Sequence, residues 1–195
     1  MDFNVLPECY VDTKLLKILV PPTTKYGYNH QKGVFMIEKV MKTELLDDFA
    51  LAVIDRDKKE VGYLAEFESV FCYIKANEIP QIEIFRHAQK HHYIIVHTNI
   101  EKWILDCAAE KNIDLVADFG LPNTLKELTK ITKTSTSENN DTYSKNIKKL
   151  FVALLNANVK SLLLLQYWVL YLKTENYQSD MAVLIAESEA ILSGI

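Results

Sequence analysis

The stretch Phe49–Asp57, FALAVIDRD, is a continuous apolar run that ends in two aspartates separated by one residue. A run of this length and apolarity predicts a strand buried on both faces, as in the interior of a parallel sheet. Ligands of such sheets gather at the carboxyl ends of the strands, which is where Asp55 and Asp57 fall. The two acids could equally cap the strand and begin a solvated turn, so their role depends on the rest of the chain.

The composition is that of an ordinary globular protein. The chain has 195 residues, of which 49% are hydrophobic and 25% charged, and it contains only five glycines and five prolines. So few turn-forming residues argue against an all-β fold. The formal net charge of −4 does not suggest a generally basic nucleic-acid binder, although clustered metal-binding carboxylates would also make a nuclease acidic.

The cysteine pattern and the apolar segments bear on the cellular compartment. Three widely spaced cysteines without a C-x-x-C pair predict reduced thiols rather than a disulfide or zinc framework. The first residues, MDFN, lack the basic and apolar regions of a signal peptide. The densest apolar segment, Leu162–Leu172, is interrupted by Gln166 and is shorter than the roughly 20 residues needed to span a bilayer. We therefore expect a cytoplasmic protein without a membrane segment.

The order of the expected elements predicts an α/β domain, because it opens as strand, helix, helix, strand. Hydrophobic periodicity and turn residues predict strands at 3–6, 49–55, 82–85, 92–97 and 115–117. Helices are expected at 10–20, 34–41, 61–67, 100–107, 124–131, 147–155, 160–173 and 179–192. We expect residues 1–120 to form a Rossmann-like, mainly parallel sheet flanked by helices, and residues 121–195 to form a C-terminal helical layer packed on it.

Further acids take the same kind of position as the D-x-D pair. Glu8 follows the first strand, Asp12 lies one helical turn later, and Glu101 begins the helix after strand 92–97. If the strands are parallel neighbours, these carboxylates meet at one edge of the sheet. Gathered carboxylates repel one another unless a cation neutralises them, so the set predicts a site for Mg²⁺ or Mn²⁺. Taken singly, Glu8 and Glu101 are better explained as helix-start acids favoured by the macrodipole.

This succession of motifs resembles the Toprim domain: a strand and Glu8, a strand and Asp55-x-Asp57, then a strand–helix unit with Glu101 near the helix start. The resemblance covers roughly residues 1–110. It is strongest to the variant in overcoming-lysogenization-defect nucleases and related small bacterial defence proteins. It implies metal-dependent cleavage of phosphodiesters in nucleic acid, with Glu8, Asp55 and Asp57 as catalytic residues. The residues that it implies as metal ligands are Glu8, Asp12, Asp55, Asp57 and Glu101.

The chain also departs from this pattern, and the departure keeps a second function open. Cys9 stands where the family has glycine, and its Cβ limits close approach of the backbone to a phosphate. The alternative is a catalytically inactive Toprim-like module that binds a protein partner or nucleic acid. The sequence has no ATPase motif, so a nuclease of this kind implies a separately encoded ATPase or another protein partner. The almost entirely apolar segment Leu162–Leu172 leaves room for a homo-oligomer through the C-terminal helices.

Two polar segments are candidates for binding substrate. The loop Tyr26–Gly33 offers Asn29, His30 and Lys32 as substrate-binding residues and Tyr28 as a stacking surface, or it is a packed connector. A basic stretch further along could follow a nucleic-acid backbone or could simply be a solvated face. Its members are Lys126, Lys130, Lys133, Lys145, Lys148 and Lys149.

Four histidines lie close together in the sequence, at His87, His91, His92 and His97. On a strand, positions 91 and 97 face one side and position 92 the other, so the rings do not converge. No cysteine or acid stands at zinc-ligand spacing from them. We therefore predict that these histidines are mainly edge or surface residues.

Overall fold

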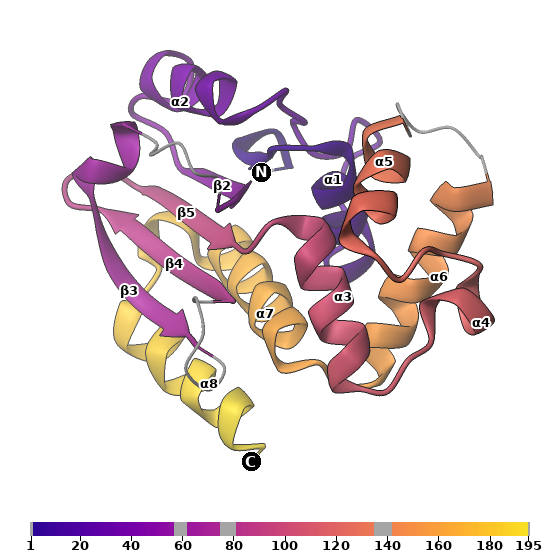
Figure 1. The fold of residues 1–195 in the computed structure, drawn as a ribbon. Coiled ribbons are helices and arrows are strands. Elements are labelled where there is room, and N and C mark those ends of the chain that lie inside the picture. Colours follow the sequence, from indigo (N-terminus) through magenta and orange to yellow (C-terminus); the bar gives the residue numbers. More distant parts are fainter. Residues whose placement is uncertain (1, 57–61, 75–80, 135–141, 195) are drawn as a thin grey trace.

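The computed structural model describes residues 2–56, 62–74, 81–134 and 142–194, and it has an α/β fold built on a five-stranded sheet (Figure 1). The strands are β1 Val5–Pro7, β2 Ala50–Asp55, β3 Phe67–Tyr73, β4 Ile82–His87 and β5 His92–His97. The helices are α1 Tyr10–Leu19, α2 Val34–Thr43, α3 Ile100–Glu110, α4 Leu115–Phe119, α5 Leu125–Thr134, α6 Thr142–Asn156, α7 Lys160–Glu175 and α8 Met181–Ser193. Short 3₁₀ segments lie at η1 Asp2–Asn4, η2 Gly62–Glu66 and η3 Asn176–Gln178.

The sheet has the strand order β1-β2-β5-β4-β3 and is mixed. β1, β2 and β5 are parallel neighbours, whereas β4 and β3 complete the sheet by antiparallel pairing. The predicted α/β class with flanking helices is confirmed. The parallel part is the part that contains the FALAVID strand, so the carboxyl ends of β1, β2 and β5 lie along one edge.

Alternation along β2 shows why this strand is apolar throughout. Leu51 and Val53 belong to the hydrophobic cluster formed with α1, α3 and the C-terminal helices. Ala50, Ala52 and Ile54 belong to a second cluster, formed with α2 on the other side of the sheet. Figure 1 shows α2 on one side of the sheet and α7 on the other. Because both faces are covered, every β2 residue before Asp55 is buried.

The helix α7 is apolar nearly all round because it packs on several sides. Its residues Leu164, Leu165 and Val169 have no exposed surface, and Trp168 meets Phe71 of β3 with ring centroids 6.0 Å apart. Residues of α6, α7 and the inner face of the sheet share one hydrophobic cluster. Among the described residues, no single helix has both the length and the apolarity to cross a membrane. One pair of consecutive helical segments passes the test when the two are taken together, by length and composition only: Thr142–Asn156 and Lys160–Gln178. The two segments are bent by 95° relative to each other.

Three elements differ from the sequence-based expectation. The helix predicted at 61–67 is, in the described residues, the 3₁₀ segment η2, and Phe67 already begins β3. Residues 115–117, predicted as a strand, form α4, because the Asp114 carboxylate caps the amides of Val116 and Ala117 at 2.9 and 3.0 Å. A short apolar run does not distinguish a strand from a helical turn, so the cap decides. Strand β3 was not predicted at all. It lies at the edge of the sheet and is only partly buried, so it lacks a clear alternating pattern.

A buried ion pair joins the start of the chain to helix α7. The Lys173 ammonium on α7 lies 2.8 Å from the Asp2 carboxylate, and the two side chains are 7% and 0% exposed. The same carboxylate accepts hydrogen bonds from the Thr23 hydroxyl and the Thr24 amide. Burial alone would raise the pKa of Asp2, but the bonds from Lys173, Thr23 and Thr24 outweigh it and hold the pKa well below its usual range.

This pair predicts acid sensitivity of the fold. A carboxyl group whose pKa is lower in the folded protein stabilises it above the unfolded pKa, about 3.9 for aspartate, and loses that contribution as the pH falls further. We expect the stability difference between the wild type and Asp2→Asn to be full at pH 6 and to shrink below about pH 4. Urea unfolding of both proteins at several pH values measures it. A difference independent of pH would contradict the prediction.

Candidate metal site

The last residues of β2 and β5 place two side chains of opposite character next to each other. Asp55 and His97 are register partners of the parallel strand pair. By alternation, Asp55 shares a face with Leu51 and Val53, which is the side covered by α1 and α3. The two side chains meet there, with Asp55 Oδ1 3.3 Å from His97 Nδ1.

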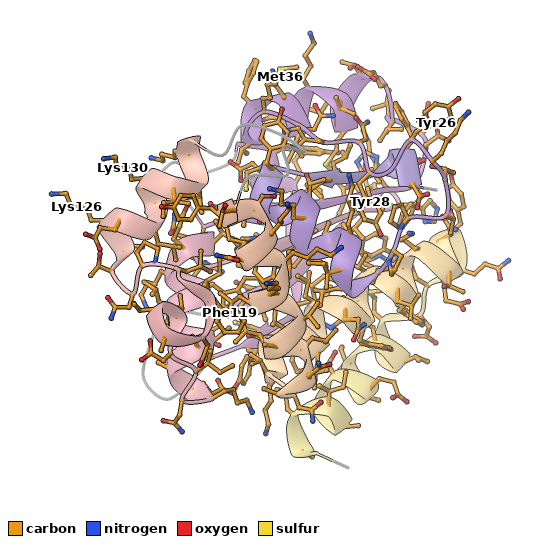
Figure 2. The ribbon with its side chains drawn as sticks, turned by 90° about the vertical axis from the view of Figure 1, so that its right-hand side faces the viewer. Tyr26, Tyr28, Met36, Phe119, Lys126 and Lys130 are labelled. Atoms are coloured by element: carbon orange, nitrogen blue, oxygen red, sulfur yellow. The ribbon has the colours of Figure 1, made fainter. Side chains whose placement is uncertain are left out.

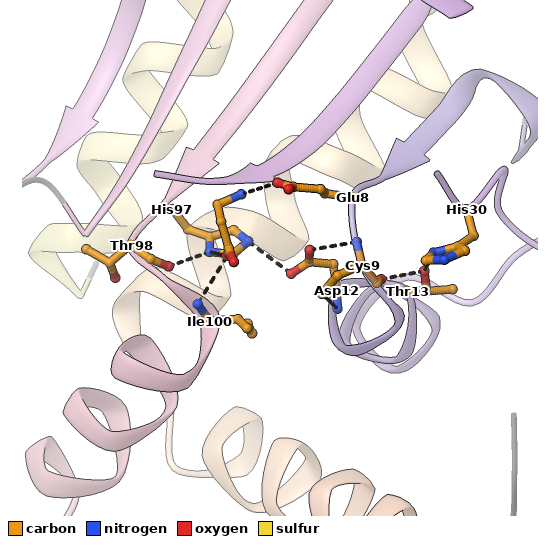
Figure 3. Close-up of polar contacts among 9 residues, drawn as sticks. Glu8, Cys9, Asp12, Thr13, His30, His97, Thr98 and Ile100 are labelled. Atoms are coloured by element: carbon orange, nitrogen blue, oxygen red, sulfur yellow. Dashed lines mark hydrogen bonds and ion pairs between the residues drawn. The ribbon is translucent and has the colours of Figure 1, made fainter. Parts of the chain in front are cut away.

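Glu8 arrives from the neighbouring strand. Its amide donates to the Val53 carbonyl at 3.0 Å, and its Oε2 accepts a 2.9 Å hydrogen bond from the Asp55 amide. Asp12, on the first turn of α1, is 1% exposed and lies 3.1 Å from His97 through Oδ1 (Figure 3). The structure therefore brings three of the predicted acids, Glu8, Asp12 and Asp55, to one edge of the sheet.

Cys9 starts helix α1 where the Toprim pattern has glycine. Its Sγ accepts from the Asp12 amide at 3.4 Å, and Asp12 Oδ2 accepts from the Cys9 amide at 3.2 Å. This reciprocal cap holds the Asp12 side chain beside the strand ends. Burial, together with the negative charge of Asp12, raises the pKa of the Cys9 thiol far above its usual range. Cys9 is therefore a helix cap with an unreactive thiol.

His97 is the member of the site that sequence reasoning missed. Its side chain is fully buried and stacks on Trp103 of α3, with ring centroids 4.8 Å apart. Burial alone would lower the pKa of His97, but the carboxylates of Asp12 and Asp55 outweigh it and raise the pKa to about 9. The rule applied to the acids, a polar residue at the carboxyl end of a buried strand, would have found His97 too.

The tautomer of His97 follows from its partners. Nδ1 lies 2.7 Å from the Thr98 carbonyl, which can only accept, so Nδ1 carries a hydrogen. Nε2 then faces Asp12 Oδ1 at 3.1 Å, and that contact is favourable only with a proton or a cation between the two atoms. A backbone carbonyl that fixes the distal ring nitrogen is the usual support of a metal-binding histidine.

The Asp55 carboxylate is held in an unfavourable place for an anion. Burial raises the pKa of Asp55 to about 7; His97 opposes this rise, and the negative charges of Asp12, Glu8 and Glu101 add to it. Its Oδ1 also accepts a 3.1 Å hydrogen bond from the Ile100 amide at the start of α3. A positive charge placed at this carboxylate would relieve the repulsion.

Three side chains are grouped closely enough to hold an ion. Asp12, Asp55 and His97 each offer one ligand atom, and all three atoms lie within 4.8 Å of one another. This limit is close to the roughly 4.4 Å that can separate two atoms bound to one ion at about 2.2 Å each. The group could therefore bind a metal ion, but the arrangement does not identify which one.

Two predicted ligands are not part of this group. Glu101 is buried, but its Oε1 accepts the hydroxyl hydrogen bond of Thr132 on α5. It acts on Asp55 as a nearby negative charge. Asp57 lies outside the described residues.

The predicted substrate-binding loop lies beside α1. The ring of His30 stacks on Tyr10 at a centroid distance of 4.1 Å, and its Nδ1 lies 3.0 Å from the Thr13 hydroxyl. Asn29 is tied into the loop by a 2.8 Å bond from Gln31 Nε2, and Lys32 is exposed. Asn29 and His30 line one cavity of about 380 Å³, and Lys32 is not among its lining residues.

The prediction for Tyr28 as a stacking surface is wrong. Its ring is 5% exposed, and its hydroxyl donates to the Val20 carbonyl. The aromatic residue that the loop exposes is Tyr26, at 84%. The first tyrosine therefore faces solvent and the second anchors the loop, a distinction that the sequence pattern does not contain.

The surface prediction for the histidines is also wrong, except for His91, which is exposed. His92 is fully buried between the Tyr63 hydroxyl and the Leu45 carbonyl, and His87 is 5% exposed beside Glu66. His92 and His97 do point to opposite faces of the sheet, as alternation predicted. Burial follows from the layers on both faces of the sheet.

Comparison with known proteins adds no family assignment. No protein-family model matches this sequence, and neither the curated proteins nor the solved structures give a significant match.

Proposed function

We propose that the acidic edge of the sheet binds a divalent cation and that the protein is a Toprim-like, metal-dependent nuclease. The observation that carries the proposal is the contact between neighbouring strand ends, where Glu8 Oε2 accepts the Asp55 amide hydrogen bond at 2.9 Å. Had these two acids stood on opposite edges of the sheet, a shared metal would have been impossible. A role in a bacterial defence system, together with a separately encoded ATPase, stays part of this proposal.

The charge balance supports a cation at this place. The negative charges of Asp12, Glu8 and Glu101 all act on the Asp55 carboxylate, and the His97 imidazole lies against both Asp12 and Asp55. Arg56 follows Asp55 directly, but its guanidinium lies 2.8 Å from Glu83 instead. Burying several carboxylates together is costly unless a positive charge accompanies them.

The ligand types narrow the choice of ion. An all-oxygen set from Glu8, Asp12 and Asp55 suits Mg²⁺, whereas inclusion of His97 Nε2 favours Mn²⁺ or another transition metal. When bound, the ion would supply Lewis-acid stabilisation of the charge that develops on a phosphate oxygen. In this arrangement Asp55 and Asp12 hold the ion, the Asp55 amide orients Glu8, and Thr98 orients His97.

A non-catalytic interaction module is the second candidate, and one observation favours it. The His97 ring already bridges Asp12 and Asp55, so these acids have a positive partner without any metal. The Cys9 cap in place of glycine points the same way, because its Cβ keeps the backbone from approaching a phosphate closely.

A fluorescence titration separates the two candidates. Trp103 stacks on His97, and the only other tryptophan is Trp168, so Trp168→Phe leaves a single reporter next to the site. We expect paramagnetic Mn²⁺ to quench Trp103 saturably, and Mg²⁺ to compete for the same site. Labelled DNA and RNA should be cleaved with either ion and not in EDTA. If millimolar Mn²⁺ neither quenches nor supports cleavage, the inactive module is the correct description.

A further inference from the structure

A cavity of about 310 Å³ opens beside the acidic edge, between helix α1 and the loop 26–33. Its lining consists of four aromatic rings, two lysines and one threonine: Tyr10, Tyr26, Tyr28, His30, Lys14, Lys17 and Thr13. Lys14 Nζ also donates to Ser144 Oγ at 2.5 Å. Aromatic rings next to lysines provide the two contacts that a nucleotide needs, a surface for its base and a positive charge for its phosphate.

Tyr26 is placed to stack with a ligand. Its ring is 84% exposed and stands out from the molecule in Figure 2. It also lines a second cavity, of about 380 Å³, together with Phe3 and Asn29. Lys25 Nζ lies over this ring, 5.1 Å from its centroid, and at 84% exposure the ring still has surface for a flat ligand, whereas an aromatic residue of the core would be covered.

Contacts of the neighbouring Tyr28 hydroxyl hold the loop that carries Tyr26. Tyr28 donates to the Val20 carbonyl, and Lys173 Nζ lies 3.2 Å from its hydroxyl. Gly27, between the two tyrosines, has a φ of 71°, and a Cβ there would approach Lys17 Cε to 3.4 Å. The turn therefore brings Gly27 close to Lys17, in a backbone conformation that suits glycine.

The cavity is connected to the acidic site by direct contacts. His30 Nδ1 meets the Thr13 hydroxyl, which in turn lies 2.9 Å from the Cys9 carbonyl. Cys9 caps the helix turn that holds Asp12. Figure 3 shows His30 and Thr13 on one side of this turn and His97 on the other. A nucleic-acid strand lying across α1 could thus contact the cavity and the acidic edge at the same time.

We infer that this cavity is a subsite for one unpaired nucleotide of a single-stranded nucleic acid. The base stacks on Tyr26, and Lys14 and Lys17 bind the adjacent phosphate. A base inside a duplex has both faces covered, so the subsite favours single strands. The inference rests on the proposed function for the identity of the substrate, but binding here does not require metal or cleavage.

The test measures binding of a labelled oligo-dT by fluorescence anisotropy. EDTA is present so that no cleavage occurs. We expect Tyr26→Ala to raise the dissociation constant on the order of tenfold and Tyr26→Phe to change it little, because stacking needs only the ring. Lys14→Ala and Lys17→Ala should each lower the salt dependence of log K by about 0.7. Phe35→Ala and Lys39→Ala on α2 are matched controls, since both residues are exposed and neither lines the cavity.

Oligonucleotide variants test the chemistry of the ligand. An abasic oligonucleotide should bind the wild type about as weakly as oligo-dT binds Tyr26→Ala, and a duplex should bind more weakly than a single strand. If the abasic oligonucleotide binds as tightly as oligo-dT, or if Tyr26→Ala matches Phe35→Ala, the subsite does not exist. If free dTMP competes as well as the oligonucleotide, the cavity binds mononucleotides and the single-strand assignment is wrong.

The outcome is separable from that of the proposed function. Tyr26-dependent binding in EDTA without any cleavage in Mn²⁺ would support the subsite and overturn the nuclease. Metal-dependent cleavage with no effect of Tyr26→Ala on binding would support the nuclease and overturn the subsite.

Discussion

Asp55→Asn is expected to abolish metal-dependent cleavage and to weaken Mn²⁺ binding by more than the roughly 10–100-fold typical of losing an outer-shell partner. The reason is that Asp55 sits at the centre of the site, in contact with His97 and adjacent to Glu8. The amide of asparagine keeps the shape and can still accept the Ile100 hydrogen bond. Cleavage rates and the Trp103 quenching titration, both in the Trp168→Phe background, measure the two effects.

The fold should tolerate this change. Removing one negative charge relieves the repulsion between Asp55 and Asp12, so we expect the free energy of unfolding to change by no more than about 1 kcal/mol. Asp106→Asn is the matched control, because it makes the same substitution on α3 in a surface pair with Lys102. Full cleavage by Asp55→Asn would remove the metal site from the mechanism. Loss of cleavage in both variants would point to a general effect on the protein.

Lys173→Met is expected to be the most destabilising single substitution considered for this protein. It leaves the Asp2 carboxylate buried without its positive partner, which costs about 3–5 kcal/mol. For a chain of this size, such a loss lowers the melting temperature by roughly 10 °C. It also removes the hydrogen bond from Lys173 Nζ to the Tyr28 hydroxyl. Oligonucleotide binding at the cavity between α1 and the loop 26–33 should therefore weaken as well. Urea and thermal unfolding measure the stability change.

A second substitution shows whether the cost comes from the unpaired charge. In Asp2→Asn/Lys173→Met the buried charge is gone, and the new amide oxygen can still accept from Thr23 and Thr24, so most of the stability should return. Lys102→Met is the control for loss of an exposed pair, which contributes only about 0–1 kcal/mol. A cost for Lys173→Met no larger than that of Lys102→Met would refute the role of the buried pair.

The elements that could be predicted are those with a local signal. Strand β2 is apolar because both of its faces are covered, and α3 is capped by Asn99, whose side chain accepts from the Lys102 amide. The edge strand β3 gave no such signal, because its exposure on one side is a property of the assembled structure. Helix α4 has a local signal in the capping carboxylate of Asp114, but the short apolar run that follows fits a strand equally well.

The candidate site divides in the same way. Glu8 and Asp55 could be placed at strand ends from the sequence, because the end of an apolar run is visible in one dimension. Whether Glu101 faced the site or Thr132 could not be predicted, because that depends on where α5 packs. Tyr28 was predicted as the stacking surface, but Tyr26 is the exposed ring, because only the turn at Gly27 determines which ring faces solvent.

By itself, the sequence determined the α/β class and the buried strand Phe49–Asp55, since apolar periodicity and turn residues act over a few neighbouring positions. Only the tertiary structure decided that β1, β2 and β5 are adjacent, and hence that Asp12, Asp55 and His97 gather within 4.8 Å. The physical reason is that strand pairing joins distant parts of the chain, such as Val5 with Leu51 and Ala50 with His92, and so brings Asp12 against His97, 85 positions away. The burial of His97 follows from layers on both faces of the sheet rather than from its neighbours in sequence.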